Sequence, residues 1–331
     1  MTAAELDVVA VGNAIVDIIA PAEESLITAE GLTKGGMQLV DAARADALYA
    51  RMGAAHESSG GSAANTIAGL AALGRRCGFI GQVAEDQFGK VFSHDIRAIG
   101  VEFTTAMRGA EPPTAQCLIF VTPDGQRTMN TFLGASQFLP AAALDRAMIE
   151  RADVLYLEGY LWDPEEPRAA MREAIAIARA AGRKIAFTLS DSFVIARHGD
   201  DFRALLAAGS IDILFANEDE ICALMGTQDV EAAVAAAAPQ VPTLVVTRSA
   251  DGALAVQDGT RVDIAAEPVD KVLDTTGAGD LFAAGFLAGQ AEGRPLDQCL
   301  RMGAICAAEI IAHYGPRPEA DLKALVAARL G

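Results

Sequence analysis

The sequence predicts an α/β fold in which a mostly parallel central sheet carries helices on both faces. Short runs rich in β-branched residues alternate with longer alanine-rich amphipathic stretches, most regularly between residues 150 and 247. Two stretches, at about 14–40 and 101–133, break this rhythm with short strands, turns that contain Gly or Pro, and little helix. We therefore expect one α/β domain over 1–331, with a small β-sheet lid formed by these two insertions.

The strands of the central sheet are predicted from short apolar runs. They are expected at 7–11, 77–81, 154–158, 184–189, 211–216 and 243–247. The stretch 168–181 is predicted to be a helix, because Met171, Ile175 and Ala178 recur on one face at helical spacing. The last part of the chain, from residue 277 onward, is predicted to be mainly helical and to include a helix over 281–290.

The composition excludes several classes of protein. With 52% hydrophobic and 21% charged residues, the 331-residue chain is expected to bury a large core and not to be disordered. Its net charge of −18 disfavours binding to nucleic acids and to anionic membranes, although a small anionic substrate is still allowed inside a cleft. The five cysteines and four histidines lack the spacing of a disulfide scaffold or a zinc site. The N-terminus lacks a signal-peptide pattern and no apolar run would span a membrane, so we expect a cytoplasmic protein.

The strongest chemical signal is the sequence DTTGAGDLF at 274–282. Gly277 and Gly279 allow a tight turn that directs the backbone N–H groups from 277 to 279, Ala278 included, outward at a helix N-terminus, where they would bind an anion. Asp280 would repel a phosphate, but it is suited to accept the proton of an attacking hydroxyl group. Phosphoryl transfer needs both parts, so Asp280 is predicted to be a general base beside an anion hole.

The motif at 274–280 and a second motif, SGGSAANT at 59–66, resemble those of the ribokinase-like (PfkB) carbohydrate kinases. Within that family the chain looks most like the adenosine-kinase branch, on the segments 11–18, 125–128, 158–160 and 213–220. The resemblance covers nearly the whole chain, and it implies a ribokinase-like fold with a single kinase domain. It also implies an ATP-dependent kinase that uses Mg²⁺.

The resemblance assigns roles to residues at both ends of the expected cleft. Asp17 would bind a pair of sugar hydroxyls, Gly60 and Gly61 would form the hinge of the lid, and Asn13 and Asn65 would contact the sugar. Asn217 and Glu220 match the Asn-x-x-Glu that organises Mg²⁺, mostly through water, and the phosphates. Taken alone, these residues also fit ordinary structural roles: turn formation, helix capping and solvated charge.

Further positions around the phosphates follow from the same resemblance. Asp274 and Thr276 match one side of a monovalent-cation site, so K⁺ is expected, and Arg127 resembles an arginine that moves onto the transferring phosphate. The nucleotide is expected to contact Thr247, Gly252 and, in a late helix, Ala307 with Ile311. At the nucleotide turn Ser249 replaces the glycine that the family usually has.

The acceptor is the least determined feature of the sequence. Phe193 matches a phenylalanine that stacks on the purine in adenosine kinases, whereas the expected pair of phenylalanines after Gly159 reads Tyr160-Leu161-Trp162. Adenosine, phosphorylated on its 5′-hydroxyl to AMP, is therefore the preferred acceptor. A sugar kinase of the fructose or ribose type, another nucleoside kinase and a noncatalytic sugar- or nucleoside-binding protein stay as alternatives, and both a monomer and a homodimer are compatible with the sequence. Neither G-x-G-x-x-G after the first strand nor a Walker A motif occurs, which disfavours a dehydrogenase and a P-loop ATPase.

Overall fold

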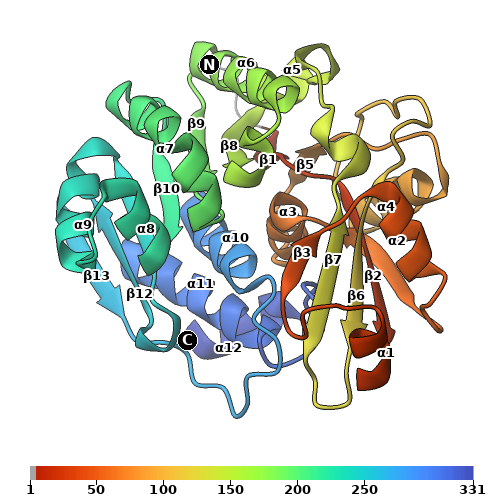
Figure 1. Cartoon of the computed structure of the whole chain (residues 1–331). Helices are drawn as coiled ribbons and strands as arrows, with labels where there is room; N and C mark the ends of the chain where they lie inside the picture. Colours follow the sequence, from red (N-terminus) through yellow and green to blue (C-terminus); the bar gives the residue numbers. More distant parts are fainter. Residues whose placement is uncertain (1–4, 331) are drawn as a thin grey trace.

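Two β-sheets organise the chain, and a computed structural model describes residues 5–330 of it. The larger sheet has the strand order β13-β12-β11-β10-β9-β8-β1-β5, and the smaller sheet has the order β3-β7-β6-β2-β4. Figure 1 shows the smaller sheet, with its red to yellow strands, beside the larger sheet and its helices. The structure confirms the predicted α/β fold with a second, smaller sheet.

In the larger sheet all neighbours from β5 to β11 run parallel, and β12 and β13 are added antiparallel at one edge. Its strands are β1 (Leu6–Val11), β5 (Cys77–Ile80), β8 (Ala152–Glu158), β9 (Lys184–Thr188), β10 (Ile213–Asn217), β11 (Thr243–Thr247), β12 (Ala253–Gln257) and β13 (Thr260–Ile264). The first six lie within two residues of the predicted strands, because their apolar runs are buried on both faces of the sheet.

Helices cover both faces of the larger sheet. Val8 and Ala10 of β1 pack into the core that contains α3, α4, α10, α11 and α12, whereas Val9 and Val11 pack into the core that contains α5 to α9. The helices are α3 (Ser62–Ala72), α4 (Gln87–Ala98), α5 (Arg146–Glu150), α6 (Glu165–Ala180), α7 (Ser192–Ala207), α8 (Glu218–Met225), α9 (Val230–Ala237), α10 (Ala278–Ala291), α11 (Leu296–Ile310) and α12 (Leu322–Leu330). Short 3₁₀ turns occur at Gly134–Gln137, Ala141–Ala143, Gly159–Trp162, Ala238–Gln240 and Ser249–Asp251.

The smaller sheet draws on more of the chain than the two predicted insertions. Its strands are β2 (Ile15–Pro21), β3 (Met37–Leu39), β4 (His56–Gly60), β6 (Ala115–Val121) and β7 (Arg127–Phe132). Strand β4 lies outside both predicted ranges; its sequence HESSG is too polar to signal a strand, and it is fixed by antiparallel pairing with β2. Two helices, α1 (Glu24–Ala29) and α2 (Ala42–Tyr49), follow β2 and β3; α1 lies within the first insertion, where little helix was expected, and α2 lies just after it.

Two further observations complete the fold. Helix α10 begins at Ala278, three residues earlier than predicted, because Gly277 adopts a left-handed φ of 80° and serves as the N-cap. Within residues 5–330 no single helix is long and apolar enough to cross a membrane; α8 together with Val230–Gln240, a pair bent by 65°, reaches that length and composition.

Candidate active site

A cavity of about 840 Å³ lies between the carboxyl ends of the parallel strands and the smaller sheet. Open α/β sheets bind ligands at this edge, and here Glu158, Thr188, Asn217 and Thr247 from the ends of β8 to β11 line the cavity. Many of the predicted site residues also line it: Asn13, Asp17, Gly61, Asn65, Phe193, Glu220, Thr276, Gly277, Ala278, Gly279 and Asp280. Gly60, Arg127, Gly252, Asp274 and Ala307 are not part of the lining.

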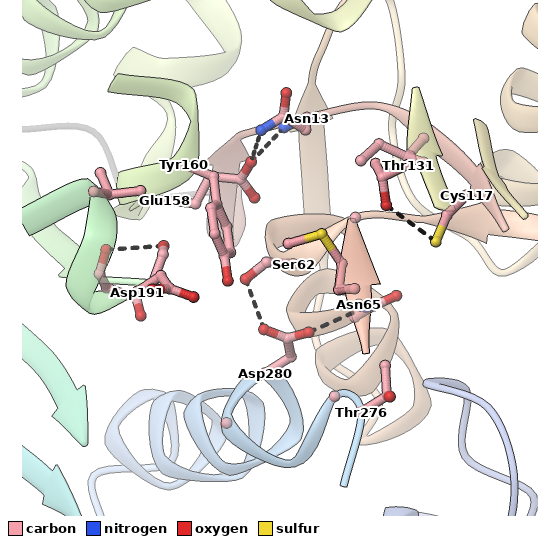
Figure 2. Close-up of a pocket in the computed structure, with 18 of the residues that line it drawn as sticks. Asn13, Ser62, Asn65, Cys117, Thr131, Glu158, Tyr160, Asp191, Thr276 and Asp280 are labelled. Carbon is pink, nitrogen blue, oxygen red and sulfur yellow. Dashed lines mark hydrogen bonds between the residues drawn. The ribbon is translucent and has the colours of Figure 1, made fainter. Parts of the chain in front are cut away.

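Asp280 lies in the first turn of α10 and is held by two side chains of α3. The Ser62 hydroxyl donates to its Oδ1 at 2.7 Å, and the Asn65 amide donates to its Oδ2 at 3.1 Å (Figure 2). Burial raises the pKa of Asp280 above its ordinary value, while these two hydrogen bonds and the charge of Arg317 oppose the rise. A fixed carboxylate of increased basicity is suited to accept a proton from a hydroxyl group.

The amide groups beside Asp280 form the start of α10. The Ala278 N–H donates to the Thr275 carbonyl at 3.1 Å, so that donor is already engaged within the turn. For Gly277, Gly279 and Asp280 no N–H partner is found in the described part of the chain. These amides, together with the positive end of the helix dipole, face the cavity and would bind a negatively charged group.

Glu158, at the end of β8, connects the first strand to the start of α3. Its Oε1 accepts hydrogen bonds from the backbone N–H and side-chain amide of Asn13, at 2.7 and 2.5 Å, and its Oε2 accepts from the Ala63 N–H at 2.7 Å. Figure 2 shows this carboxylate beside Asn13. Burial raises its pKa to about 7. No functional role was predicted for Glu158 from the sequence, and its position at a strand end is the signal that would have indicated one.

Asp17 of β2 and Gly60 of β4 lie on paired strands, where Asp17 is opposite Ser58 and Gly60 is opposite Ile15. A Cβ atom on Gly60 would lie 2.3 Å from the Asp17 Oδ2 atom, so glycine is required to make room for this carboxylate. Burial raises the pKa of Asp17 to about 6, and the nearby charges of Arg317 and Arg127 limit the increase. Gly61, the N-cap of α3, has a φ of 99° that favours glycine.

Arg317 is a half-buried cation that the sequence did not reveal. Its guanidinium donates to the carbonyl and hydroxyl oxygens of Ser59 and, at 3.2 Å, to the Ala64 carbonyl. It therefore fixes the chain on both sides of the Gly60-Gly61 junction. Its charge lowers the pKa values of Asp17 and Asp280. An arginine between two prolines carries no sequence signal of such burial.

Asn217 and Glu220 form a reciprocal capping box at the start of α8. The Asn217 side chain accepts from the Glu220 N–H at 2.8 Å, and the Glu220 carboxylate accepts from the Asn217 N–H at 3.0 Å. Both residues also line the cavity, near Asp191. Burial, together with the charges of Asp191 and Asp219, raises the pKa of Glu220 to about 7. No group of three or more His, Cys, Asp or Glu residues that could hold a metal ion is found within 5–330, so the oxygen donors present fit a hydrated Mg²⁺ and not a metal held by the protein alone.

Arg127 and Asp274 lie next to each other outside the cavity lining. The Arg127 guanidinium forms an ion pair with the Asp274 Oδ2, and both side chains are buried. Asp274 also accepts hydrogen bonds from the N–H groups of Thr276 at 3.0 Å and Gly315 at 3.2 Å. In this structure the Arg127 guanidinium is therefore paired with a carboxylate and does not line the cavity.

The expected nucleotide turn is only partly at the cavity. Thr247 lines the cavity, whereas Ala307, a residue of α11, packs against the hydrophobic core. Gly252 has a φ of 91° and a Cβ there would lie 2.1 Å from the Ile264 carbonyl oxygen, so its glycine is explained by backbone packing. Ser249 adopts a left-handed φ of 49°, which is why a glycine would suit this position.

Two aromatic residues, Tyr160 and Phe193, also line the cavity. The ring centroids of Tyr160 and Phe193 are 6.4 Å apart, and the Arg197 guanidinium lies 4.9 Å from the Phe193 centroid. Trp162 is fully buried against Phe187 and Phe202, so it is a core residue and not a replacement for a base-stacking phenylalanine.

Comparisons with known proteins extend over almost the whole chain. A family model described as pfkB family carbohydrate kinase matches residues 6–322. The crystal structure of an adenosine kinase from Sinorhizobium meliloti is 47% identical with a TM-score of 0.90, covering 99% of each chain. A probable sugar kinase from Rhizobium etli CFN 42 is 45% identical with a TM-score of 0.90, covering 99% of this chain and 98% of the other. Among curated proteins, a 5-dehydro-2-deoxygluconokinase from Shouchella clausii is 27% identical over 279 residues, which are 81% of this chain and 86% of the relative.

Proposed function

The chain belongs to the pfkB family of carbohydrate kinases, phosphotransferases with an alcohol group as acceptor, and from this premise we propose that it transfers phosphate from ATP to the 5′-hydroxyl of adenosine. Within the family, the chain resembles the adenosine-kinase branch, and the adenosine kinase from Sinorhizobium meliloti is 47% identical to it. The coarser assignment, a sugar or nucleoside kinase, rests on the family. The choice of adenosine rests on the cavity.

The aromatic and apolar residues that line the cavity carry the proposal. Tyr160 and Phe193 offer ring faces there, and the smaller sheet adds an apolar wall of Met37, Leu39, Ile119, Met129 and Leu133. A purine presents two large flat faces that such a surface would bury, whereas a free pentose or hexose presents mostly hydroxyl groups. The polar residues Asp17 and Asn65, which also line the cavity, then match the ribose.

The polar residues supply the chemistry in this proposal. Asp17 accepts hydrogen bonds from ribose hydroxyls, and so does the Oδ1 atom of Asn65, which has no hydrogen-bond partner among residues 5–330. Asp280 accepts the proton of the 5′-hydroxyl, and the first-turn amides of α10 receive the charge of the transferring phosphoryl group. Closure of the small sheet over the acceptor would exclude water that competes for the phosphoryl group.

ATP would bring Mg²⁺ to the strand ends near Asn217, Glu220 and Asp191. Carboxylate and amide oxygens suit this ion, and the pKa of Glu220 is raised first by burial and then by the charges of Asp191 and Asp219, which a cation would offset. When bound, the ion neutralises phosphate charge. This arrangement needs no basic surface, so it is compatible with the net charge of −18.

A panel of acceptors tests the proposal. We would measure kcat/KM with MgATP for adenosine, inosine, guanosine, cytidine, ribose and fructose, and we expect adenosine to exceed each of the others by at least about 10-fold. A preference for fructose or ribose would instead identify a sugar kinase, in line with the Rhizobium etli and Shouchella clausii relatives. A preference for another nucleoside would retain the aromatic site but reject adenosine.

A further inference from the structure

The ion pair between Arg127 and Asp274 joins the smaller sheet to the loop that precedes the anion hole. Arg127 is the first residue of β7, and Asp274 lies three residues before Gly277, the N-cap of α10. Their side chains are 4% and 6% exposed. We propose that the Arg127 guanidinium supplies, from within the chain, the positive charge for which a monovalent cation beside Asp274 would otherwise be needed, so that the kinase works without K⁺.

The surroundings of Asp274 do not fit a potassium ion. K⁺ requires free oxygen lone pairs, and the Asp274 Oδ2 has both of its own engaged, by the Gly315 N–H and by Arg127, while Oδ1 accepts from the Thr276 N–H and retains one. A second cation placed at this carboxylate would be repelled by the guanidinium, which stays charged at any ordinary pH. The carboxylate therefore already has its counter-ion.

Arg127 acts through Asp274 and is in this sense a positioning residue. Asp274 holds the N–H of Thr276, directly before the anion-hole turn, and the N–H of Gly315, in the loop after α11. The Nε and one terminal nitrogen of Arg127 have no partner in the described part of the chain, so its charge is directed at this one carboxylate. Without a cation, the buried charge of Asp274 would be uncompensated and the turn would lose its support.

The positive charge of Arg127 is part of the smaller sheet, because this residue begins β7. Arg127 follows the β6–β7 turn, and that turn packs closely on the loop after α11, since a Cβ on Gly125 would lie 2.0 Å from the Tyr314 hydroxyl. A dissolved ion would be present whatever the position of the sheet. Arg127 is present only while the hairpin is docked, which couples the docked sheet to an ordered anion hole.

The first experiment varies the cation with the wild-type enzyme. The acceptor is whichever compound of the panel is turned over best, so the result does not depend on adenosine being the substrate. KCl is exchanged for tetramethylammonium chloride at constant ionic strength, and we expect kcat to change by less than about 2-fold and the Tm of the ligand-free protein to stay constant. Activation by K⁺ of about 3-fold or more would overturn the proposal.

The second experiment removes the internal cation. In Arg127→Ala without K⁺ we expect kcat to fall by about 10²-fold. Addition of K⁺ should raise the kcat of the variant by at least about 5-fold and should also raise the Tm of the ligand-free variant. The Tm readout separates this role from that of a phosphate ligand, because no nucleotide is present. A folded variant that responds to K⁺ in neither measurement would overturn the proposal, and if the variant does not fold, the wild-type titration still decides.

Arg44→Ala is the matched control for the second experiment. Arg44 also makes an ion pair near the smaller sheet, with Glu30, but its side chain is 34% exposed and lies away from Asp274. We expect this variant to show no response to K⁺ in activity or Tm. A response equal to that of Arg127→Ala would mean that K⁺ acts elsewhere, and it would reject the role given to Asp274.

Discussion

The Ser62 hydroxyl donates a 2.7 Å hydrogen bond to the Oδ1 atom of Asp280, although 218 residues separate the two along the chain. This contact joins the start of α3, on the acceptor side of the cavity, to the start of α10, on the phosphate side. Both helices begin with a glycine N-cap in a left-handed conformation, Gly61 and Gly277. The proposed base is thus positioned by a contact between two helix starts.

Asp280→Asn is expected to lower kcat by at least about 10²-fold with every acceptor that the enzyme uses, because the amide cannot accept the hydroxyl proton. Binding of the acceptor, measured by calorimetry without ATP, should change little. Asp153→Asn, at an exposed position of β8, is the control and should retain normal turnover. Full activity in Asp280→Asn would reject the assignment of the base.

Ser62→Ala is expected to move the acid limb of the kcat/KM profile to higher pH. The Ser62 hydrogen bond lowers the pKa of Asp280, so its loss raises that pKa further, and a larger share of the base is protonated at a given pH. A shift of about half a pH unit would be measurable. Ser93→Ala removes a buried hydroxyl that bonds within α4 and should leave the profile unchanged. An unshifted profile in Ser62→Ala would show that another group sets the acid limb.

Gly60→Ala is expected to raise KM for the acceptor by about 10-fold or more, since the added methyl group displaces the Asp17 carboxylate and a hydrogen bond to a charged group contributes about 1.5–3 kcal/mol. KM for ATP should stay within about 2-fold of the wild type. Gly53→Ala is the matched control, because nothing lies within 4 Å of a Cβ at that position. Equal effects of both substitutions would contradict the role of Asp17.

Asp17→Asn is expected to change how stability depends on pH. The pKa of Asp17 is raised from 3.8 in the unfolded chain to about 6 in the folded protein, so between these values the folded state binds more protons and stability falls as pH rises. The free energy of unfolding of the wild type, relative to the variant, should therefore decrease within this window, with a slope of at most about 1.4 kcal/mol per pH unit, and become constant above it. Urea unfolding from pH 4 to 7 measures the difference. Asp46→Asn, at an exposed position, should give a curve parallel to the wild type.

Phe193→Ala is expected to raise KM for nucleosides by about 10-fold and to leave the weak use of free sugars unchanged, because stacking on a base contributes about 1–3 kcal/mol. Phe193 is 38% exposed on the cavity wall, and Phe138, 40% exposed outside it, supplies the control Phe138→Ala. If Phe193→Ala affected ribose and adenosine alike, the aromatic residues of the cavity would not form the base site.

The sequence was most informative where the signal is local. The strand 243–247 was predicted with the same bounds as β11, because a short continuous apolar run in an α/β protein indicates a buried strand. The motif at 274–280 likewise identified the start of α10. The helix begins three residues earlier than predicted, since the glycines of the motif had been interpreted as part of a loop.

Features that depend on distant contacts could not be predicted. Strand β4 is polar and exists because β2 offers it a partner, and the roles of Glu158 and Arg317 are defined by groups 95 or more residues away. Arg127 was expected at the phosphate and lies against Asp274, since the pairing of a buried cation is decided by the fold and not by its neighbours in sequence. The roles of the individual site residues stay predictions for the experiments above.

The smaller sheet is assembled from two separate passages of the chain, one through β2, β3 and β4 and one through β6 and β7. Strands β1 and β5 of the larger sheet precede and interrupt these passages, so the two sheets are interwoven. No single deletion can remove the smaller sheet, and no single transplanted segment can exchange it for that of a relative. An effort to alter acceptor choice by swapping parts between enzymes would need to replace both passages together, and evolution of a new acceptor is more easily achieved one side chain at a time.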